Sequence, residues 1–66
     1  MKLLNSVYEL RKYSDITQEE LAQEIGVTRQ TIIAMEKGNY VPSVALAIKI
    51  AGYFKRAVED IFSIEK

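Results

Sequence analysis

Cysteine, histidine and tryptophan are absent from this chain of 66 residues, and proline occurs once. Without cysteine the chain forms neither disulfides nor thiolate metal sites, and without histidine it lacks the most common metal ligand and acid-base catalyst. No apolar run approaches the roughly 18 residues that a membrane-spanning helix needs. These absences predict a cytoplasmic protein that has no metal, no cofactor and no membrane anchor.

A net charge is also lacking, since nine basic residues balance nine acidic ones. This balance argues against a strong non-specific attraction to a polyanion. The charges are unevenly placed, because acidic residues gather between positions 15 and 24, whereas residues 27–43 carry only Arg29, Glu36 and Lys37. The middle of the chain is therefore locally positive if another side chain neutralises Glu36.

Apolar periodicity is the main feature that the chain does contain. Apolar residues make up 48% of the sequence and recur three and four positions apart, which is typical of amphipathic helices, and no segment alternates in the manner of a half-buried strand. The pattern predicts five helices, at about 4–13, 17–25, 28–37, from 43 onward and at about 58–62. A chain of this length holds one small core, so we expect a single all-α domain over residues 1–66.

The second and third predicted helices have clear start and stop signals. Thr17 and Glu20 have the spacing of a capping box, in which each side chain accepts a hydrogen bond from the other residue's backbone N–H. Gly26 suits the left-handed conformation that ends a helix, and Thr28 follows it as the next N-cap. The intervening turn is too short for antiparallel neighbours, so the helices must cross steeply, and the small side chain of Ala22 allows a close approach. This geometry predicts a helix-turn-helix motif over about residues 17–36.

The stretch ITQEELAQEIGVTRQTIIAMEKGNYVPS resembles the Cro and lambda-repressor-like helix-turn-helix family, also called the XRE family. The similarity extends over nearly the whole chain, from YELRK through LAIKIAGYF to VEDIF. The resemblance implies a compact five-helix, sequence-specific DNA-binding domain that binds a two-fold operator on double-stranded DNA as a homodimer. It also implies a transcriptional regulator, more readily a repressor than an activator, that needs no small-molecule ligand.

The resemblance further assigns roles to individual positions. The family positions that read bases, or lie beside them in the groove, are occupied here by Arg29, Gln30, Ile33 and Ala34. The positions that contact phosphates, or lie in the loop that follows the DNA backbone, are occupied by Gln18, Thr28, Asn39 and Tyr40. Arg11 and Glu36 fall where several members form a buried ion pair, and both lie on core-facing stripes, where a buried charge needs a partner.

The side chains at these positions suit DNA on chemical grounds as well. The guanidinium fork of Arg29 can donate to O6 and N7 of guanine, and the amide of Gln30 can pair with N6 and N7 of adenine. Gln18 begins a helix, where free backbone N–H groups and the positive end of the helix dipole favour a phosphate. Lys37 precedes the loop and supplies a positive charge for another phosphate. The alternative is that Arg29 and Gln30 only solvate an exposed helix end.

Five positions depart from the family pattern or leave two interpretations open. Asp15 replaces the glycine common after the first helix, and aspartate takes the left-handed conformation at modest cost. Ile33 stands where many members carry a polar residue, and it either borders the core or offers an apolar surface to thymine methyl groups. Tyr40 either packs under the loop or donates its hydroxyl to a phosphate. Lys55 replaces a glycine and Ala57 replaces a Ser or Thr cap, so we expect the fifth helix to be less well held.

An enzyme is not expected, because the chain lacks histidine, cysteine, metal-spaced carboxylates and a glycine-rich phosphate loop. The alternative to DNA binding is a protein-interaction module, such as an antitoxin-type subunit that docks on a partner protein. The neutral charge and the apolar end IFSIEK are compatible with docking. The candidates for a dimer interface are apolar residues of the C-terminal region, namely Phe54, Ile61, Phe62 and Ile64.

Overall fold

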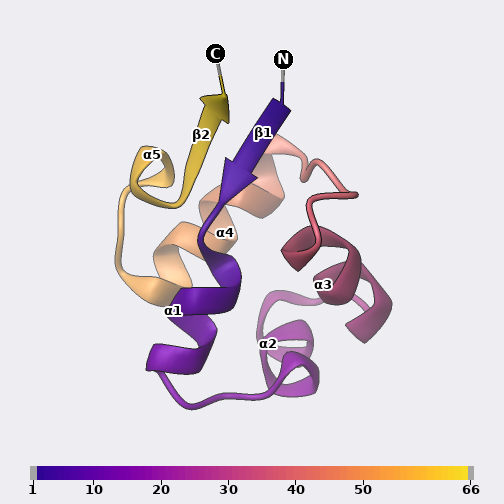
Figure 1. The fold of residues 1–66 in the computed structure, drawn as a ribbon. Coiled ribbons are helices and arrows are strands. Elements are labelled where there is room, and N and C mark those ends of the chain that lie inside the picture. Colours follow the sequence, from indigo (N-terminus) through magenta and orange to yellow (C-terminus); the bar gives the residue numbers. More distant parts are fainter. Residues whose placement is uncertain (1, 66) are drawn as a thin grey trace.

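The computed structural model describes residues 2–65, which form five helices and two short strands (Figure 1). In chain order the elements are β1 (Lys2–Asn5), α1 (Val7–Tyr13), α2 (Gln18–Ile25), α3 (Arg29–Glu36), α4 (Val44–Phe54), α5 (Val58–Ile61) and β2 (Phe62–Glu65). The five helices confirm the predicted fold class. The two strands add a small sheet that the helical periodicity did not predict.

Hydroxyl side chains begin three of the helices. The backbone N–H of Glu20 donates to Thr17 Oγ1 at 3.0 Å and that of Thr17 donates to Glu20 Oε1 at 2.8 Å, so the predicted capping box is confirmed. Thr28 Oγ1 accepts from the backbone N–H of Thr31 at 3.2 Å, and Ser43 caps α4 in the same way. Caps of this kind each stabilise a helix by about 1 kcal/mol.

Left-handed backbone conformations occur at the turns between helices. Gly26, with φ 77°, ends α2 as predicted, and Asp15, with φ 58°, takes the left-handed conformation expected of it. Lys55 adopts φ 57° directly after α4, where an ordinary side chain costs about 1 kcal/mol or more. Ala57 then offers no side-chain acceptor to α5, although Asp60 Oδ2 accepts the Ala57 N–H at 3.3 Å. The fifth helix begins at Val58, as predicted, and is four residues long.

The prediction for the two chain ends was wrong in one respect. Residues from about Leu4 were expected in the first helix, but Lys2–Asn5 form β1, which pairs antiparallel with β2. The last predicted helix is shortened for the same reason, because Phe62 begins β2 opposite Asn5. Four residues are too few to distinguish a helical period from a strand period, and each strand's partner lies at the other end of the chain.

One core collects side chains from all five helices and from β2. The buried apolar residues are Val7, Leu21, Ala22, Ile25, Ile32, Met35, Leu46, Ile50, Ala51, Ile61 and Phe62. Ile61 and Phe62 are only 3% and 8% exposed, so two of the four residues expected at a dimer interface belong to the core instead. Leu4, which was expected at the start of the first helix, is 41% exposed in β1.

Candidate nucleic-acid interface

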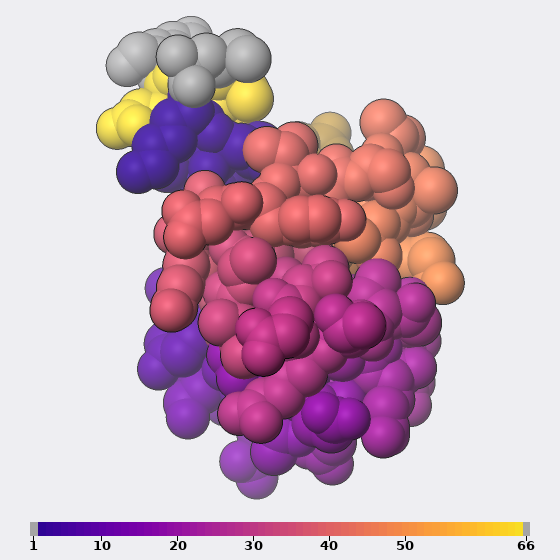
Figure 2. Space-filling model, turned by 90° about the vertical axis from the view of Figure 1, so that its right-hand side faces the viewer, coloured from indigo at the N-terminus to yellow at the C-terminus, as the bar shows by residue number. Residues whose placement is uncertain are grey.

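The helix α3 has an apolar back and a polar tip. Ile32 and Met35 are fully buried against the core, whereas Arg29 and Gln30 are exposed in the first turn. In Figure 2, α3, coloured magenta to pink, lies at the centre of the face that points to the viewer. The first turn of α3 therefore presents two adjacent hydrogen-bonding side chains to solvent.

Ile33 and Ala34 lie beside this tip at the border between core and surface. Both are half-buried, so each has one side against the domain and part of its surface accessible. An apolar side chain in this position can contact the methyl group of thymine, which is the apolar feature of the major groove.

The segment that follows α3 lies on the same face. Lys37, Asn39 and Tyr40 are exposed, Tyr40 by 38%. In Figure 2 the segment around residue 40, coloured coral, runs directly above α3. The backbone N–H of Asn39 donates to the carbonyl oxygen of Ala34 at 2.9 Å, which ties this segment to α3. The structure thus groups these three residues, all predicted to contact phosphates, in the segment that directly follows the C-terminal end of α3.

Thr28 and Gln18, the other predicted phosphate contacts, already make internal hydrogen bonds. Thr28 Oγ1 lies 3.0 Å from Thr31 Oγ1, and it can still donate its own proton to a phosphate when Thr31 donates to it. Gln18 is half-buried, and its Nε2 donates to Glu36 Oε1 at 3.1 Å. What suits Gln18 to a phosphate is therefore its backbone N–H, which lies in the first turn of α2, where N–H groups have no helical partner.

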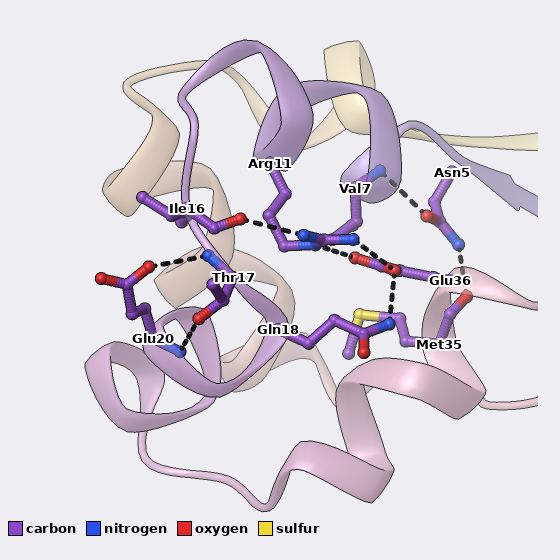
Figure 3. Close-up of polar contacts among 9 residues, drawn as sticks. All are labelled: Asn5, Val7, Arg11, Ile16, Thr17, Gln18, Glu20, Met35 and Glu36. Carbon is purple, nitrogen blue, oxygen red and sulfur yellow. Dashed lines mark hydrogen bonds and ion pairs between the residues drawn. The ribbon is translucent and has the colours of Figure 1, made fainter.

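Arg11 and Glu36 meet in the interior behind this face (Figure 3). Arg11 Nε lies 2.7 Å from Glu36 Oε2 and Arg11 Nη2 lies 3.2 Å from Oε1, and the two side chains are 8% and 6% exposed. A third donor, Arg11 Nη1, bonds the carbonyl oxygen of Ile16 at 2.9 Å. The hydrogen bond with Glu36 raises the pKa of Arg11 above its ordinary value, so the guanidinium stays charged. Because Arg11 neutralises Glu36, the charges that residues 27–43 present to solvent are those of Arg29 and Lys37.

An open groove of about 570 Å³ lies between the end of α1 and the starts of α2 and α3. Its lining includes the cations Lys12 and Arg29 as well as the carboxylates of Asp15 and Glu19. The start of α2 adds the positive end of a helix dipole. The groove therefore presents charges of both signs next to the first turn of α3.

One residue that contacts α3 from outside the motif was not predicted from the sequence. Asn5 Nδ2 donates to the carbonyl oxygen of Met35 at 3.0 Å, and Asn5 Oδ1 accepts from the backbone N–H of Val7 at 3.0 Å (Figure 3). An asparagine ahead of an apolar run is a helix start signal, which would have moved the beginning of the first helix past Asn5. The contact with Met35 has no such signal, because 30 positions separate the two residues.

Three further observations concern residues 2–65. None of their helices has the length and apolar content that crossing a bilayer requires. Over the same range, no three acidic side chains are grouped in a way that could hold a metal ion. Every buried side-chain nitrogen or oxygen in this part of the chain has a hydrogen-bond partner.

Comparisons with known proteins agree with this geometry. A helix-turn-helix family model matches residues 7–61. The uncharacterised HTH-type transcriptional regulator YgzD of Bacillus subtilis is 50% identical over 62 residues, which cover 94% of each chain. The uncharacterised HTH-type transcriptional regulator MJ0272 of Methanocaldococcus jannaschii is 52% identical over 61 residues, which cover 92% of each chain.

Two more distant proteins share the same fold or motif. The cryptic phage CTXphi transcriptional repressor RstR of Vibrio cholerae is 32% identical over 59 residues, which cover 89% of this chain and 53% of RstR. A crystal structure of a candidate DNA-binding protein from Bacteroides fragilis covers 92% of this chain and 98% of its own, with a TM-score of 0.82 and 20% identity, and so shows the fold. The chain belongs to the helix-turn-helix family and is a DNA-binding transcriptional regulator of the HTH type.

Proposed function

We propose that this regulator is a cytoplasmic repressor that binds a palindromic operator as a homodimer, with α3 in the major groove of each half-site. The observation that carries the proposal is the first turn of α3, where Arg29 and Gln30 are exposed side by side while Ile32 and Met35 behind them are fully buried. A firmly packed helix with free hydrogen-bonding side chains at its start is suited to reading base edges. The relative RstR, a transcriptional repressor by name, supports repression rather than activation.

Base reading is assigned to the tip of α3. Arg29 fits O6 and N7 of guanine and Gln30 fits N6 and N7 of adenine, and each bidentate pair discriminates by about 1–3 kcal/mol. Ile33 and Ala34 lie where they can contact a thymine methyl group. Two such tips in a dimer supply a large part of the affinity difference between specific and non-specific DNA.

Phosphate contacts are assigned to residues at both ends of α3. Lys37, Asn39 and Tyr40 form one group, and Thr28 with the backbone N–H of Gln18 forms the other. Contacts of this kind fix the orientation of the domain on the duplex and carry no sequence information directly. The exposed charge of Lys37 makes its contribution dependent on salt concentration.

Selection of bound sequences from a random double-stranded DNA library tests the proposal. We expect enrichment of a palindrome whose half-sites are centred about 34–36 Å, or one helical turn, apart. The matched control is the double variant Arg29→Ala, Gln30→Ala, which changes two exposed side chains and leaves the core intact. Failure of the wild-type chain to enrich any motif, or enrichment of the same motif by the double variant, would contradict the proposal. A protein partner that both chains capture equally would favour the docking alternative.

The proposed homodimer needs a surface that two copies can share. Of the four sequence-based candidates, Ile64 is the one that remains more than half exposed, at 51%. The structure adds an apolar strip, defined as Val41, Val44 and Ile48, which are 72%, 77% and 57% exposed along the loop and the outer side of α4. Residues 38–48 contain no charged side chain, so two copies can meet there about a two-fold axis without like-charge repulsion. The apolar strip is therefore the proposed dimer surface.

A pair of matched lysine variants tests this assignment. Val44→Lys should shift the protein from dimer to monomer in sedimentation velocity, because it places two like charges at the proposed two-fold interface. Ile64→Lys alters an exposed apolar side chain on β2 and should leave the dimer intact. The reverse pattern would move the interface to the sheet formed by β1 and β2.

A further inference from the structure

Asn5 lies where β1, α1 and α3 meet, and both β2 and α3 are far from it in the sequence. It is the last residue of β1 and lies opposite Phe62 of β2. Its side-chain Oδ1 accepts from the backbone N–H of Val7 at the start of α1, and its Nδ2 donates to the carbonyl oxygen of Met35 near the end of α3, both at 3.0 Å (Figure 3). One amide group therefore links the terminal sheet, defined as β1 and β2, to α1 and α3.

We infer that Asn5 is a positioning residue for DNA binding, through which the terminal sheet fixes the last turn of α3 and the phosphate-contacting segment that follows it. The inference rests on the proposed function, because that segment carries Lys37, Asn39 and Tyr40. It assigns the sheet a part in DNA binding even though the sheet lies outside the helix-turn-helix motif.

The main chain around Asn5 is held by contacts with the C-terminal part of the chain. The backbone N–H of Ser6 donates to the carbonyl oxygen of Ile61 at 3.0 Å, and the residue opposite Asn5 in the sheet, Phe62, is 8% exposed. The main chain of Asn5 is thus held by residues of the core at the other end of the chain. A short side chain with two rotatable bonds then carries that fixed position to α3.

The Met35 carbonyl is hydrogen-bonded both to Asn5 and to the beginning of the loop that follows α3. The last carbonyl groups of a helix have no helical N–H partner, so they need donors from elsewhere. The Met35 carbonyl accepts from the backbone N–H of Gly38 at 3.0 Å as well as from Asn5, and the N–H of Asn39 bonds the carbonyl of Ala34 at 2.9 Å. Movement of the Met35 carbonyl would therefore move the beginning of the loop with it.

The Asn5 amide meets two different needs at the site, because it accepts through its oxygen and donates through its nitrogen. The Val7 end requires an acceptor, and the Met35 end requires a donor. A carboxylate accepts but does not donate, and an alanine side chain does neither. Asn5→Asp accordingly keeps the start of α1 while it removes the link to α3 and places a negative charge beside a carbonyl oxygen.

The test compares wild type, Asn5→Asp and the control Ser6→Ala, because the Ser6 side chain is adjacent and makes no capping hydrogen bond. In the Asn5→Asp chain we expect faster hydrogen exchange at the Gly38 and Asn39 amides and DNA binding weakened by up to about tenfold, the equivalent of one hydrogen bond. The slope of log affinity against log salt should flatten, and base preference should stay the same, because phosphate contacts are lost while the tip is unchanged. Loss of overall stability alone would leave the salt slope of the folded fraction unchanged.

Equal exchange at Gly38 and Asn39 in wild type and Asn5→Asp, an unchanged salt slope, or the same changes in Ser6→Ala would each overturn the inference. A second measurement needs no variant: NMR on the wild-type chain should detect a scalar coupling across the hydrogen bond between Asn5 Nδ2 and the Met35 carbonyl carbon. Absence of that coupling would also overturn it. If the wild-type chain binds no selected DNA, the proposed function fails, whereas the exchange and coupling experiments still decide whether Asn5 holds the end of α3.

Discussion

The two ends of α3 differ in their contacts. We call the C-terminal end, whose side chains and carbonyl groups are bound by other elements, the held end, and the N-terminal end, whose side chains extend into solvent, the free end. At the C-terminal end, Glu36 is bound by Arg11 and Gln18, and the Met35 carbonyl is bound by Asn5. At the N-terminal end, Arg29 and the neighbouring Gln30 extend into solvent, and the Thr28 cap fixes the backbone. The difference shows that the helix is oriented from the end away from the proposed base contacts. Stability and base reading should therefore respond to different mutations.

Removing the ion pair at the held end of α3 should cause the largest loss of stability. Arg11→Met leaves the Glu36 carboxylate buried without its cation, so we expect the free energy of unfolding to fall by about 3–5 kcal/mol in urea titration. The double variant Arg11→Met, Glu36→Leu removes both charges and should recover most of that loss. A loss under about 1 kcal/mol for Arg11→Met would show that this pair behaves as a solvated surface ion pair.

A substitution at the free end should change base preference in DNA binding and leave the stability of the fold unchanged. Arg29→Ala should remove preference at one base position by about 1–3 kcal/mol, measured with operator variants, because one bidentate contact is lost. The unfolding free energy should stay within about 0.5 kcal/mol of wild type, as for other exposed substitutions. The remaining operator positions serve as internal controls. Preserved preference at every position would place Arg29 outside the groove.

Removing the Thr28 cap at the free end of α3 should lower stability by less than removing the ion pair at the held end. Thr28→Ala removes the acceptor for the Thr31 N–H and should lower the free energy of unfolding by about 1 kcal/mol. Thr28→Ser keeps the hydroxyl and should stay close to wild type. If the serine variant is as unstable as the alanine variant, packing of the threonine methyl group outweighs the cap.

The smallest effect is expected for Lys37, which directly follows the held end of α3, and it concerns DNA affinity. Lys37→Ala should weaken binding to all sequences alike and reduce the slope of log affinity against log salt by about 0.9, the value for one phosphate contact. Lys2→Ala removes an exposed charge from the terminal sheet and is the matched control. An unchanged slope for Lys37→Ala, or an equal change for Lys2→Ala, would remove Lys37 from the phosphate-contacting group.

Both ends of α3 were partly predictable from the sequence. At the held end, the family resemblance and the core-facing stripes implied the pair of Arg11 and Glu36, and the structure contains it at 2.7 Å. In the helix-turn-helix that leads into the free end, the capping box of Thr17 and Glu20 and the glycine turn at Gly26 follow from local spacing, and the structure confirms both. The roles of Arg29 and Gln30 follow from side-chain chemistry and family resemblance, and they stay predictions.

What the sequence did not predict depends on residues that meet across long distances in the chain. The strands β1 and β2 are separated by the whole domain, and Asn5 reaches Met35 from 30 positions away. Gln18 shows the same limit, because its position predicted an outward contact, whereas its amide points inward to Glu36. Local patterns fix where helices begin and end, but apart from the Arg11–Glu36 pair, which the family resemblance implied, they did not show which side chains of other elements come within bonding distance.

The pairing of β1 with β2 also determines how this domain can be joined to others. Lys2 lies opposite Glu65 in the sheet, and the start of β1 and the end of β2 lie side by side at the top of Figure 1. A reporter or second module fused before residue 2 or after residue 65 would therefore emerge from one place, whichever terminus is used. The linker would need only to clear the sheet, and the solvent-facing start of α3 would stay unobstructed in both fusions.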